Sequence, residues 1–343
     1  MKNFKLISFL ITIAASLLFL QCTTDPIAGP AGEDGLDGVD GVDGVNSTTE
    51  CAQCHNVTTS EAVHASYLFS GHAAGAAASY AGGRASCAQC HSNEGFIDYI
   101  TLGATNEDGY ANPTAITCTT CHDMHTTFDF EGEGYDFALR TLAPVDLIVD
   151  PGYTINYEGT SNACASCHQP RTATPVDNGM GLYQVTSTHW GPHHGPQVTM
   201  LEGIQGAELA GSVDYPAIAS ATHRTGSSCT NCHMGETSGE IDGNHTWIPT
   251  PIACNVCHTN GAPSEVAGLE ADMEALLVLL EEIGIVHIDE EGAVHPVTGT
   301  YTITEAEAAW NYLFVMEDAS NGVHNPAYAK ALIKNSLETL SAN

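Results

Sequence analysis

The sequence predicts a mainly α protein with extensive loops and a helical C-terminal segment, and three observations lead to this fold class. The 343 residues include 13 cysteines and 17 histidines, and twelve of the cysteines recur in copies of one short motif. These copies are too closely spaced for each to have a domain of its own, which favours short helices and loops. The spacing of apolar residues that is typical of amphipathic helices is clearest in the last third of the chain.

The charge of the chain is strongly negative. It has 41 acidic and 8 basic residues, which give a formal net charge of -33. A polyanionic surface repels a phosphate backbone, so nucleic-acid binding is excluded. The hydrophobic content of 43% is too high for a disordered acidic tail. These values predict a folded, acidic protein.

Residues 1–21 have the pattern of an export signal. Lys2 and Lys5 precede the apolar run from Leu6 to Leu20, which is shorter than a membrane anchor. Cys22 follows and resembles the lipid-modified cysteine of bacterial lipoproteins, so we expect lipidation and an outer-membrane anchor facing the periplasm or the cell exterior. The alternative is an ordinary signal cleaved nearby, with Cys22 lost or left as a free thiol. The mature chain would have 6 basic and 41 acidic groups, a net charge of -35.

Residues 22–48 are predicted to be a spacer. Glycine occupies every third position from Gly29 to Gly44, as in collagen. Six such units with one proline are few for a stable triple helix. We therefore expect a solvated acidic spacer, with calcium binding by its aspartates as the weaker alternative.

The other twelve cysteines all belong to six Cys-x-x-Cys-His motifs within residues 49–262, the predicted binding domain. The motif cysteines are Cys51, Cys54, Cys87, Cys90, Cys118, Cys121, Cys164, Cys167, Cys229, Cys232, Cys254 and Cys257, and the motif histidines are His55, His91, His122, His168, His233 and His258. This motif is the attachment signature of c-type haem, in which two thiols add to the porphyrin and the imidazole binds the iron. Zinc knuckles and disulfides do not require a histidine after every cysteine pair. We therefore predict six covalently bound c-type haems, with these histidines as proximal ligands.

From residue 51 to 343 the chain thereby resembles the bacterial multihaem c-type cytochromes. The resemblance implies a multihaem cytochrome c fold organised around stacked haems, with haem attached outside the cytoplasmic membrane. With roughly fifty residues per haem, the haems themselves would supply much of the hydrophobic core. Neighbouring haems would then lie close enough to pass electrons along a chain.

Eleven histidines outside the motifs could supply a second imidazole to all six irons. If the segment around His122 is helical, His125 lies on the same face and must bind a neighbouring haem. Near the N-terminus, we favour His72 over His64 as a distal ligand. The loop at 188–196 contains three further candidates, His189, His193 and His194. We expect His193 or His194 to be the ligand.

Three more distal candidates depend on a narrower resemblance. The segments around His223 and His245 resemble parts of the cytochrome c nitrite reductase and octahaem reductase superfamily. His324-Asn-Pro resembles the C-terminal segment of the pentahaem nitrite reductases. The resemblance implies that all three histidines are distal haem ligands.

Residues 263–343 are predicted to be a helical region that supplies one of these ligands. Apolar residues spaced from Val266 to Ile283 predict a first helix, capped by Ser264. Thr304 and Glu307 form a predicted capping box for a second helix. Asn325-Pro326 is expected to start a third helix that runs to Leu340. Comparable helices form a dimer interface in the reductases, which implies a homo-oligomer.

These features favour an electron carrier over an enzyme. Iron bound by two imidazoles leaves no open position for a substrate. The alternative is a multihaem reductase of nitrite, hydroxylamine or a sulfur oxyanion, but the Cys-x-x-Cys-Lys motif of the nitrite reductases is absent and the negative surface repels anions. A further alternative is a subunit of an extracellular cytochrome filament. The expected partners are redox proteins or an extracellular acceptor, together with the membrane that holds the lipid anchor.

Overall fold

The structure, a computed structural model, describes residues 51–343 except 129–131, 133–135, 240 and 343. The predicted signal, Cys22 and the glycine-rich spacer lie outside the described residues. The chain divides into two units, Met1–Ala52 and Gln53–Asn343. All six motif histidines lie in the second unit.

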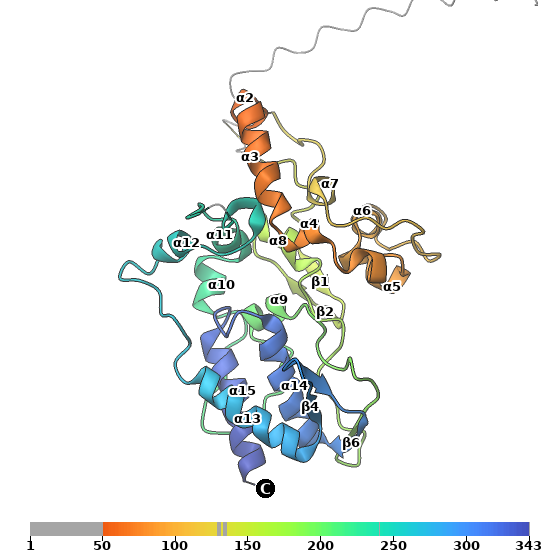
Figure 1. Ribbon diagram of the computed structural model, residues 1–343, viewed down its shortest axis with the longest axis vertical. Coiled ribbons are helices and arrows are strands. Elements are labelled where there is room, and N and C mark those ends of the chain that lie inside the picture. Colours follow the sequence, from red (N-terminus) through yellow and green to blue (C-terminus); the bar gives the residue numbers. More distant parts are fainter. Residues whose placement is uncertain (1–50, 129–131, 133–135, 240, 343) are drawn as a thin grey trace, which may run out of the picture. The chain divides into compact units, whose positions relative to one another are not determined.

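The motif-bearing part of this unit consists of short helices joined by loops (Figure 1). In chain order they are α2 (Cys51–Cys54), α3 (Val57–Leu68), α4 (Gly71–Ala74), a π-helix η1 (Ala78–Gly82), α5 (Ala85–His91), α6 (Asn93–Leu102), α7 (Cys118–Cys121), α8 (Ser161–Ala165), α9 (Gln197–Glu202), α10 (Thr222–Gly226), α11 (Cys229–His233), a 3-10 helix η2 (Asn244–Thr246) and α12 (Pro251–Asn255). Every motif starts in one of these helices, because Cys-x-x-Cys spans about one helical turn. In three motifs whose helix stops before the histidine, the turn still closes: the backbone N–H groups of His122, His168 and His258 donate to the first cysteine's carbonyl at 2.9–3.0 Å.

The motif-bearing part has a small apolar core of its own. The longest of its helices, α3, buries none of its residues. A cluster of Val145, Leu147, Ile155 and Val198 surrounds the antiparallel pair β1 (Val145–Leu147) and β2 (Asp150–Ile155). Such a small core agrees with an interior completed by bound groups.

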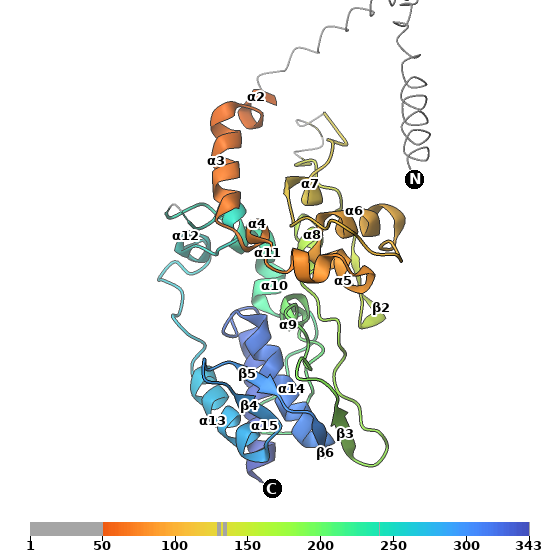
Figure 2. The same ribbon diagram turned by 45° about the vertical axis from the view of Figure 1, so that its right-hand side comes forward.

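The larger core lies among three longer helices, α13 (Leu269–Ile283), α14 (Ile303–Asp318) and α15 (Pro326–Ser341), which lie side by side in Figures 1 and 2. Trp310, Phe314 and Tyr328 are fully buried there. The Asn311 side chain accepts from the Ala207 N–H at 2.7 Å and donates to the Ala207 carbonyl at 2.8 Å. These bonds tie the loop after α9 to α14, so the motif-bearing part is joined to the C-terminal core.

Two small antiparallel sheets accompany these helices. In one, β3 (Leu182–Val185) pairs with β6 (Gly299–Thr302), and in the other β4 (Val286–Ile288) pairs with β5 (Val294–Pro296). Neither these sheets nor β1–β2 were part of the prediction from sequence. The predicted fold class, mainly α with extensive loops and a C-terminal helical segment, is nevertheless confirmed.

Two of the three predicted helix starts are wrong. The first helix begins at Leu269 with Gly268 at the cap, not at Ser264, because Gly268 has a left-handed φ of 80° that a continuous helix does not allow. The capping box of α14 is Thr302 with Glu305, two residues before the predicted pair, because the helix starts where β6 ends. The third start is correct, since the Asn325 side chain accepts from the Tyr328 N–H and Pro326 is the first helical residue.

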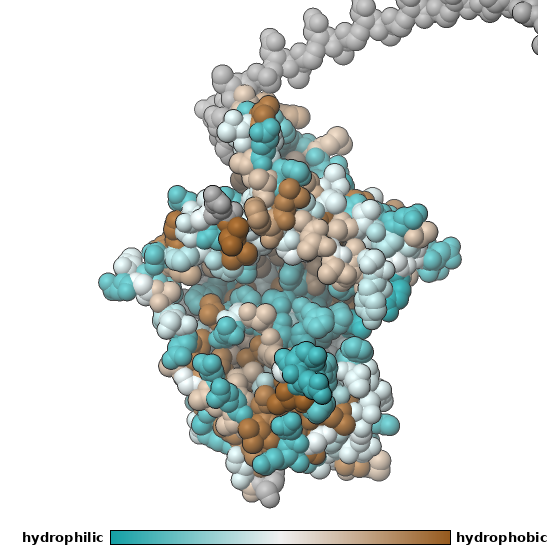
Figure 3. Space-filling view, in the orientation of Figure 1, coloured by the Kyte–Doolittle hydropathy of each residue, from teal (hydrophilic) through white to brown (hydrophobic). Residues whose placement is uncertain are grey.

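The surface between the motif-bearing short helices and the C-terminal helices is recessed. In the space-filling view it is hollowed between the short helices and the C-terminal helices, and hydrophilic as well as hydrophobic residues line the recess (Figure 3).

Candidate functional site

Each of the six motif histidines faces one histidine from outside the motifs. The pairs and their ring-centroid separations are His55 with His125 (5.9 Å), His91 with His193 (5.9 Å), His122 with His245 (6.2 Å), His168 with His72 (6.2 Å), His233 with His324 (6.2 Å) and His258 with His223 (6.2 Å). Each motif histidine is used once, and so is each partner.

This separation is the one expected for two imidazoles on opposite sides of a metal ion. An imidazole nitrogen binds a metal at about 2.0 Å, and the ring centre lies about 1.1 Å behind that nitrogen, so two axial rings have centres about 6.2 Å apart. The six pairs agree with this value to within 0.3 Å. Contacts of Trp247 with its aromatic neighbours, by contrast, range from 4.6 to 6.5 Å. The residues therefore fit an iron porphyrin held between two imidazoles.

Hydrogen bonds orient half of these twelve rings. Nδ1 lies near a backbone carbonyl oxygen in three of them: His122 with Phe137 at 2.8 Å, His223 with Val323 at 2.5 Å and His233 with Trp247 at 2.8 Å. In three others Nδ1 lies near a side-chain oxygen: His125 with Asp136 at 2.6 Å, His168 with Gln197 at 3.3 Å and His324 with Asp318 at 2.6 Å. A ring that donates from Nδ1 keeps the lone pair on Nε2 free for a metal.

Burial lowers the pKa of several of these rings and so favours the neutral form, which is the form that binds a metal. Desolvation, followed by the charge of His168, lowers the pKa of His72 to about 4. Desolvation, followed by the charge of Arg171, lowers the pKa of His193 to about 4. Burial is also the main cause that lowers the pKa values of four more rings: His91, His168, His233 and His245.

His324 is the exception among the buried rings. Burial alone would lower its pKa, but the hydrogen bond and the charge of Asp318 outweigh burial and raise it. Asp318 is a neighbour that the sequence did not identify, although it lies six residues before His324.

The motif cysteines bring separate motifs together. From Cys54 to Cys257 they are thiols that form no disulfides in the described chain. The Cys167 thiol donates to the Gln89 carbonyl of the second motif at 3.5 Å. The thiols of Cys90 and Cys167 lie close together, and so do those of Cys164 and Cys229. The fourth motif, Cys164 to His168, therefore lies beside the second and the fifth.

Trp247 joins the third, fourth and fifth motifs. Its ring lies 4.6 Å from that of His72, the partner of the fourth motif, and 5.4 Å from that of His245, the partner of the third. Its carbonyl accepts from His233 of the fifth motif at 2.8 Å. This tryptophan was not among the site residues predicted from the sequence.

Three of the nine predicted distal candidates do not face a motif histidine. His64 stacks on Tyr67, with ring centroids 6.4 Å apart. The Nδ1 of His194 lies 2.5 Å from the Glu317 carboxylate, and its side chain is exposed. The backbone N–H of His189, another exposed residue, donates to the Ser187 hydroxyl.

The segment from His122 to His125 is not helical, which was the condition for expecting both rings on one face. Helix α7 ends at Cys121, and His122 is extended with φ -107° and ψ 147°, so the helical spacing does not apply. His125 nevertheless faces His55 of another motif, because the extended segment carries it away from His122.

No protein-family model matches this chain, and no curated protein sequence is similar to it. A solved structure, that of the outer cell wall cytochrome OcwA, is similar in fold. The TM-score is 0.50 at 20% sequence identity, over 80% of this chain and 49% of that chain. The chain thus spans about half the length of that cytochrome. At this identity the likeness concerns the fold, which is that of a cytochrome.

Proposed function

We propose that the protein is a multihaem c-type cytochrome that carries electrons along six haems, each bound by two imidazoles. The observation that carries this proposal is the set of six histidine pairs, each joining one motif histidine to one other histidine at 5.9–6.2 Å. The cytochrome fold shared with OcwA supports it independently.

In this proposal the twelve motif cysteines form the thioether bonds and the motif histidines are the proximal ligands. The distal ligands are His125, His193, His245, His72, His324 and His223, in the order of the six motifs. The resemblance of the His324 segment to the nitrite reductase and octahaem reductase superfamily supports the role of His324. Each haem supplies one-electron chemistry between ferric and ferrous iron.

The chain's own residues favour transfer over catalysis. Each histidine pair would hold its iron with two imidazoles, so the ligand set need not change with oxidation state and no position would be left for a substrate. The contacts between Cys90 and Cys167 and between Cys164 and Cys229 place three attachment sites side by side. Haems attached there would lie close enough for rapid electron exchange.

The location and partners belong to the same proposal. We propose an exported protein, anchored through a lipid on Cys22, that exchanges electrons with redox proteins or an extracellular acceptor, as a homo-oligomer or a filament subunit. The outer cell wall location in the name of OcwA supports export. In the described part of the chain, no helix is both long and apolar enough to span a bilayer.

Intact mass and spin state test the proposal. The purified protein is expected to carry six covalent haems, all low-spin when oxidised. Replacing the paired histidine in His72→Ala should make one haem in six high-spin, whereas the control His64→Ala, eight residues away, should leave all six low-spin. Fewer than six haems, or the same spectrum for the two variants, would contradict the proposal.

A further inference from the structure

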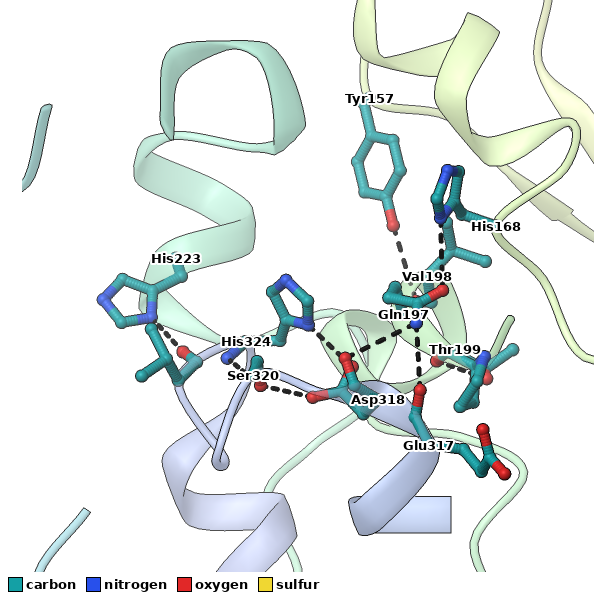
Figure 4. Close-up of polar contacts among 12 residues, drawn as sticks. Tyr157, His168, Gln197, Val198, Thr199, His223, Glu317, Asp318, Ser320 and His324 are labelled. Carbon is teal, nitrogen blue, oxygen red and sulfur yellow. Dashed lines mark hydrogen bonds and ion pairs between the residues drawn. The ribbon is translucent and has the colours of Figure 1, made fainter. Parts of the chain in front are cut away.

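Asp318 is a buried carboxylate whose partners are a histidine ring and a hydroxyl. Its side chain is 0% exposed, and Oδ1 lies 2.6 Å from Nδ1 of His324. The Ser320 hydroxyl donates to Oδ2, and the same hydroxyl accepts from the His324 N–H at 3.2 Å (Figure 4). Among the ion pairs of the described residues, none joins Asp318 to a lysine or an arginine.

A carboxylate in such a site needs a counter-charge. Burying an ionised carboxylate without a partner is costly, and a hydroxyl donor offsets only part of that cost. Asp318 contacts Nδ1 of His324, so a cation bound to Nε2 of the same ring would supply the counter-charge. A carboxylate on Nδ1–H also makes the imidazole a stronger donor to a metal. Both effects favour the more highly charged state of the metal.

The ring of His223, on α10, provides a comparison because its acceptor lies in the same loop as His324. Nδ1 of His223 donates to the neutral carbonyl of Val323, the residue directly before His324 (Figure 4). In His72 and His245, Nδ1 is buried and has no hydrogen-bond partner among the described residues. His125 also has a carboxylate partner, Asp136, but there the ring and the carboxylate are 25% and 13% exposed. Asp318 is the more completely desolvated of the two carboxylates.

We propose that Asp318, acting through His324, is a positioning residue that stabilises the ferric state of the haem at His233 and His324. This inference rests on the proposed function. The carboxylate would lower the reduction potential of this haem below that of the haems whose distal rings have a neutral hydrogen-bond partner or none. Electrons would then reside preferentially on haems other than this one.

The test is a potentiometric titration of the holoprotein, followed by EPR. In Asp318→Asn, the reduction potential of one haem is expected to rise by at least about 59 mV. For one electron, this is a tenfold change in the ferric–ferrous equilibrium constant. Ser320→Ala removes a donor to the same carboxylate and should shift that haem in the opposite direction. The matched control is Glu317→Gln, which removes the negative charge next to Asp318 in the chain. The Glu317 carboxylate bonds the ring of His194, which faces no motif histidine. This variant should move no haem by as much.

Several outcomes would overturn the inference. It fails if Asp318→Asn shifts no haem, if Glu317→Gln produces an equal shift, or if Asp318→Asn leaves one haem high-spin, which would mean that the carboxylate only holds the ligand in place. If Asp318→Asn does not accumulate, Ser320→Ala decides, and the absence of a downward shift is then the contrary result. A wild-type protein with fewer than six haems would contradict the proposed function instead.

Discussion

The rings of His72 and Trp247 meet edge to face, with centroids 4.6 Å apart and planes at 70°. The same indole meets the ring of His245 at 75°. Within the described part of the chain, neither imidazole has a hydrogen-bond partner on its buried Nδ1, so contact with the indole replaces the polar contact that orients other rings. Trp247 has a positive φ of 56°, which is uncommon outside glycine. Its position is therefore set by these contacts rather than by its own backbone preference.

Replacing this indole should disturb two haems and leave four unchanged. In Trp247→Phe the smaller ring loses part of its contact with His72 and His245, whereas the backbone carbonyl that bonds His233 remains. We expect the EPR signals of two haems to shift with no loss of haem. The control is Trp190→Phe, in a tryptophan whose ring contacts are Tyr183 and Trp310. Shifts in the control, or in all six haems of the first variant, would contradict this role.

The angles between the paired rings predict two classes of haem. The planes meet at 37° in His122–His245 and at 41° in His233–His324, but at 62–81° in the other four pairs. This angle controls the splitting of the iron d orbitals in low-spin ferric haem. Quantitative EPR of the oxidised protein should show two haems with ordinary rhombic signals and four with strongly anisotropic ones. Six equivalent signals would be inconsistent with these angles.

The fourth motif should matter more for stability than the sixth. Ala165 and Ser166 within the fourth are 0% and 1% exposed, and its thiols meet two other motifs, whereas Val256 within the sixth is 77% exposed. Replacing Cys164 and Cys167 by alanine should remove one haem and lower the melting temperature by about 10 °C or more, roughly 3 kcal/mol.

The matched control is the replacement of Cys254 and Cys257 by alanine, which also removes one haem. Mass spectrometry counts the haems and circular dichroism follows melting. Equal melting temperatures for the two variants would show that the fourth motif has no central structural role.

The motif cysteines and histidines could be predicted from sequence because that chemistry is local, whereas three of the distal candidates depended on a family resemblance. Cys-x-x-Cys-His places its groups within five residues, and the nine distal candidates include all six histidines that face a motif. The pairing of His55 with His125, or of His122 with His245, joins segments far apart in the chain. Such pairings depend on tertiary packing, which no spacing rule contains.

The helix starts show a second limit. Residues 302–307 contain two overlapping capping boxes of equal spacing, Thr302 with Glu305 and Thr304 with Glu307. The choice depends on the pairing of Thr302 with Leu182 across β6 and β3, which ends the strand at that residue. Asp318 and Trp247 could not be predicted as site residues from sequence. Each belongs to the site only because the fold brings it against a histidine ring.

An ion pair between Arg224 and the buried Glu202 lies next to His223, and breaking this pair should destabilise the protein. Arg224, next to His223 on α10, lies 2.7 Å from Glu202 on α9, whose side chain is 1% exposed. Arg224→Met leaves this carboxylate buried with one remaining donor, the Tyr153 hydroxyl at 3.2 Å. We expect a loss of about 3 kcal/mol in the free energy of unfolding, measured by urea titration.

The partner and a surface pair provide the controls for this last prediction. Adding Glu202→Gln to Arg224→Met removes the unpaired charge, so the double variant should regain part of the lost stability. Asp123→Asn breaks the pair between Arg140 and an aspartate that is 51% exposed, and should cost less than about 1 kcal/mol. If Arg224→Met costs no more than Asp123→Asn, the buried pair does not stabilise α9 and α10. In that case His223 must be held in place by its bond to Val323 instead.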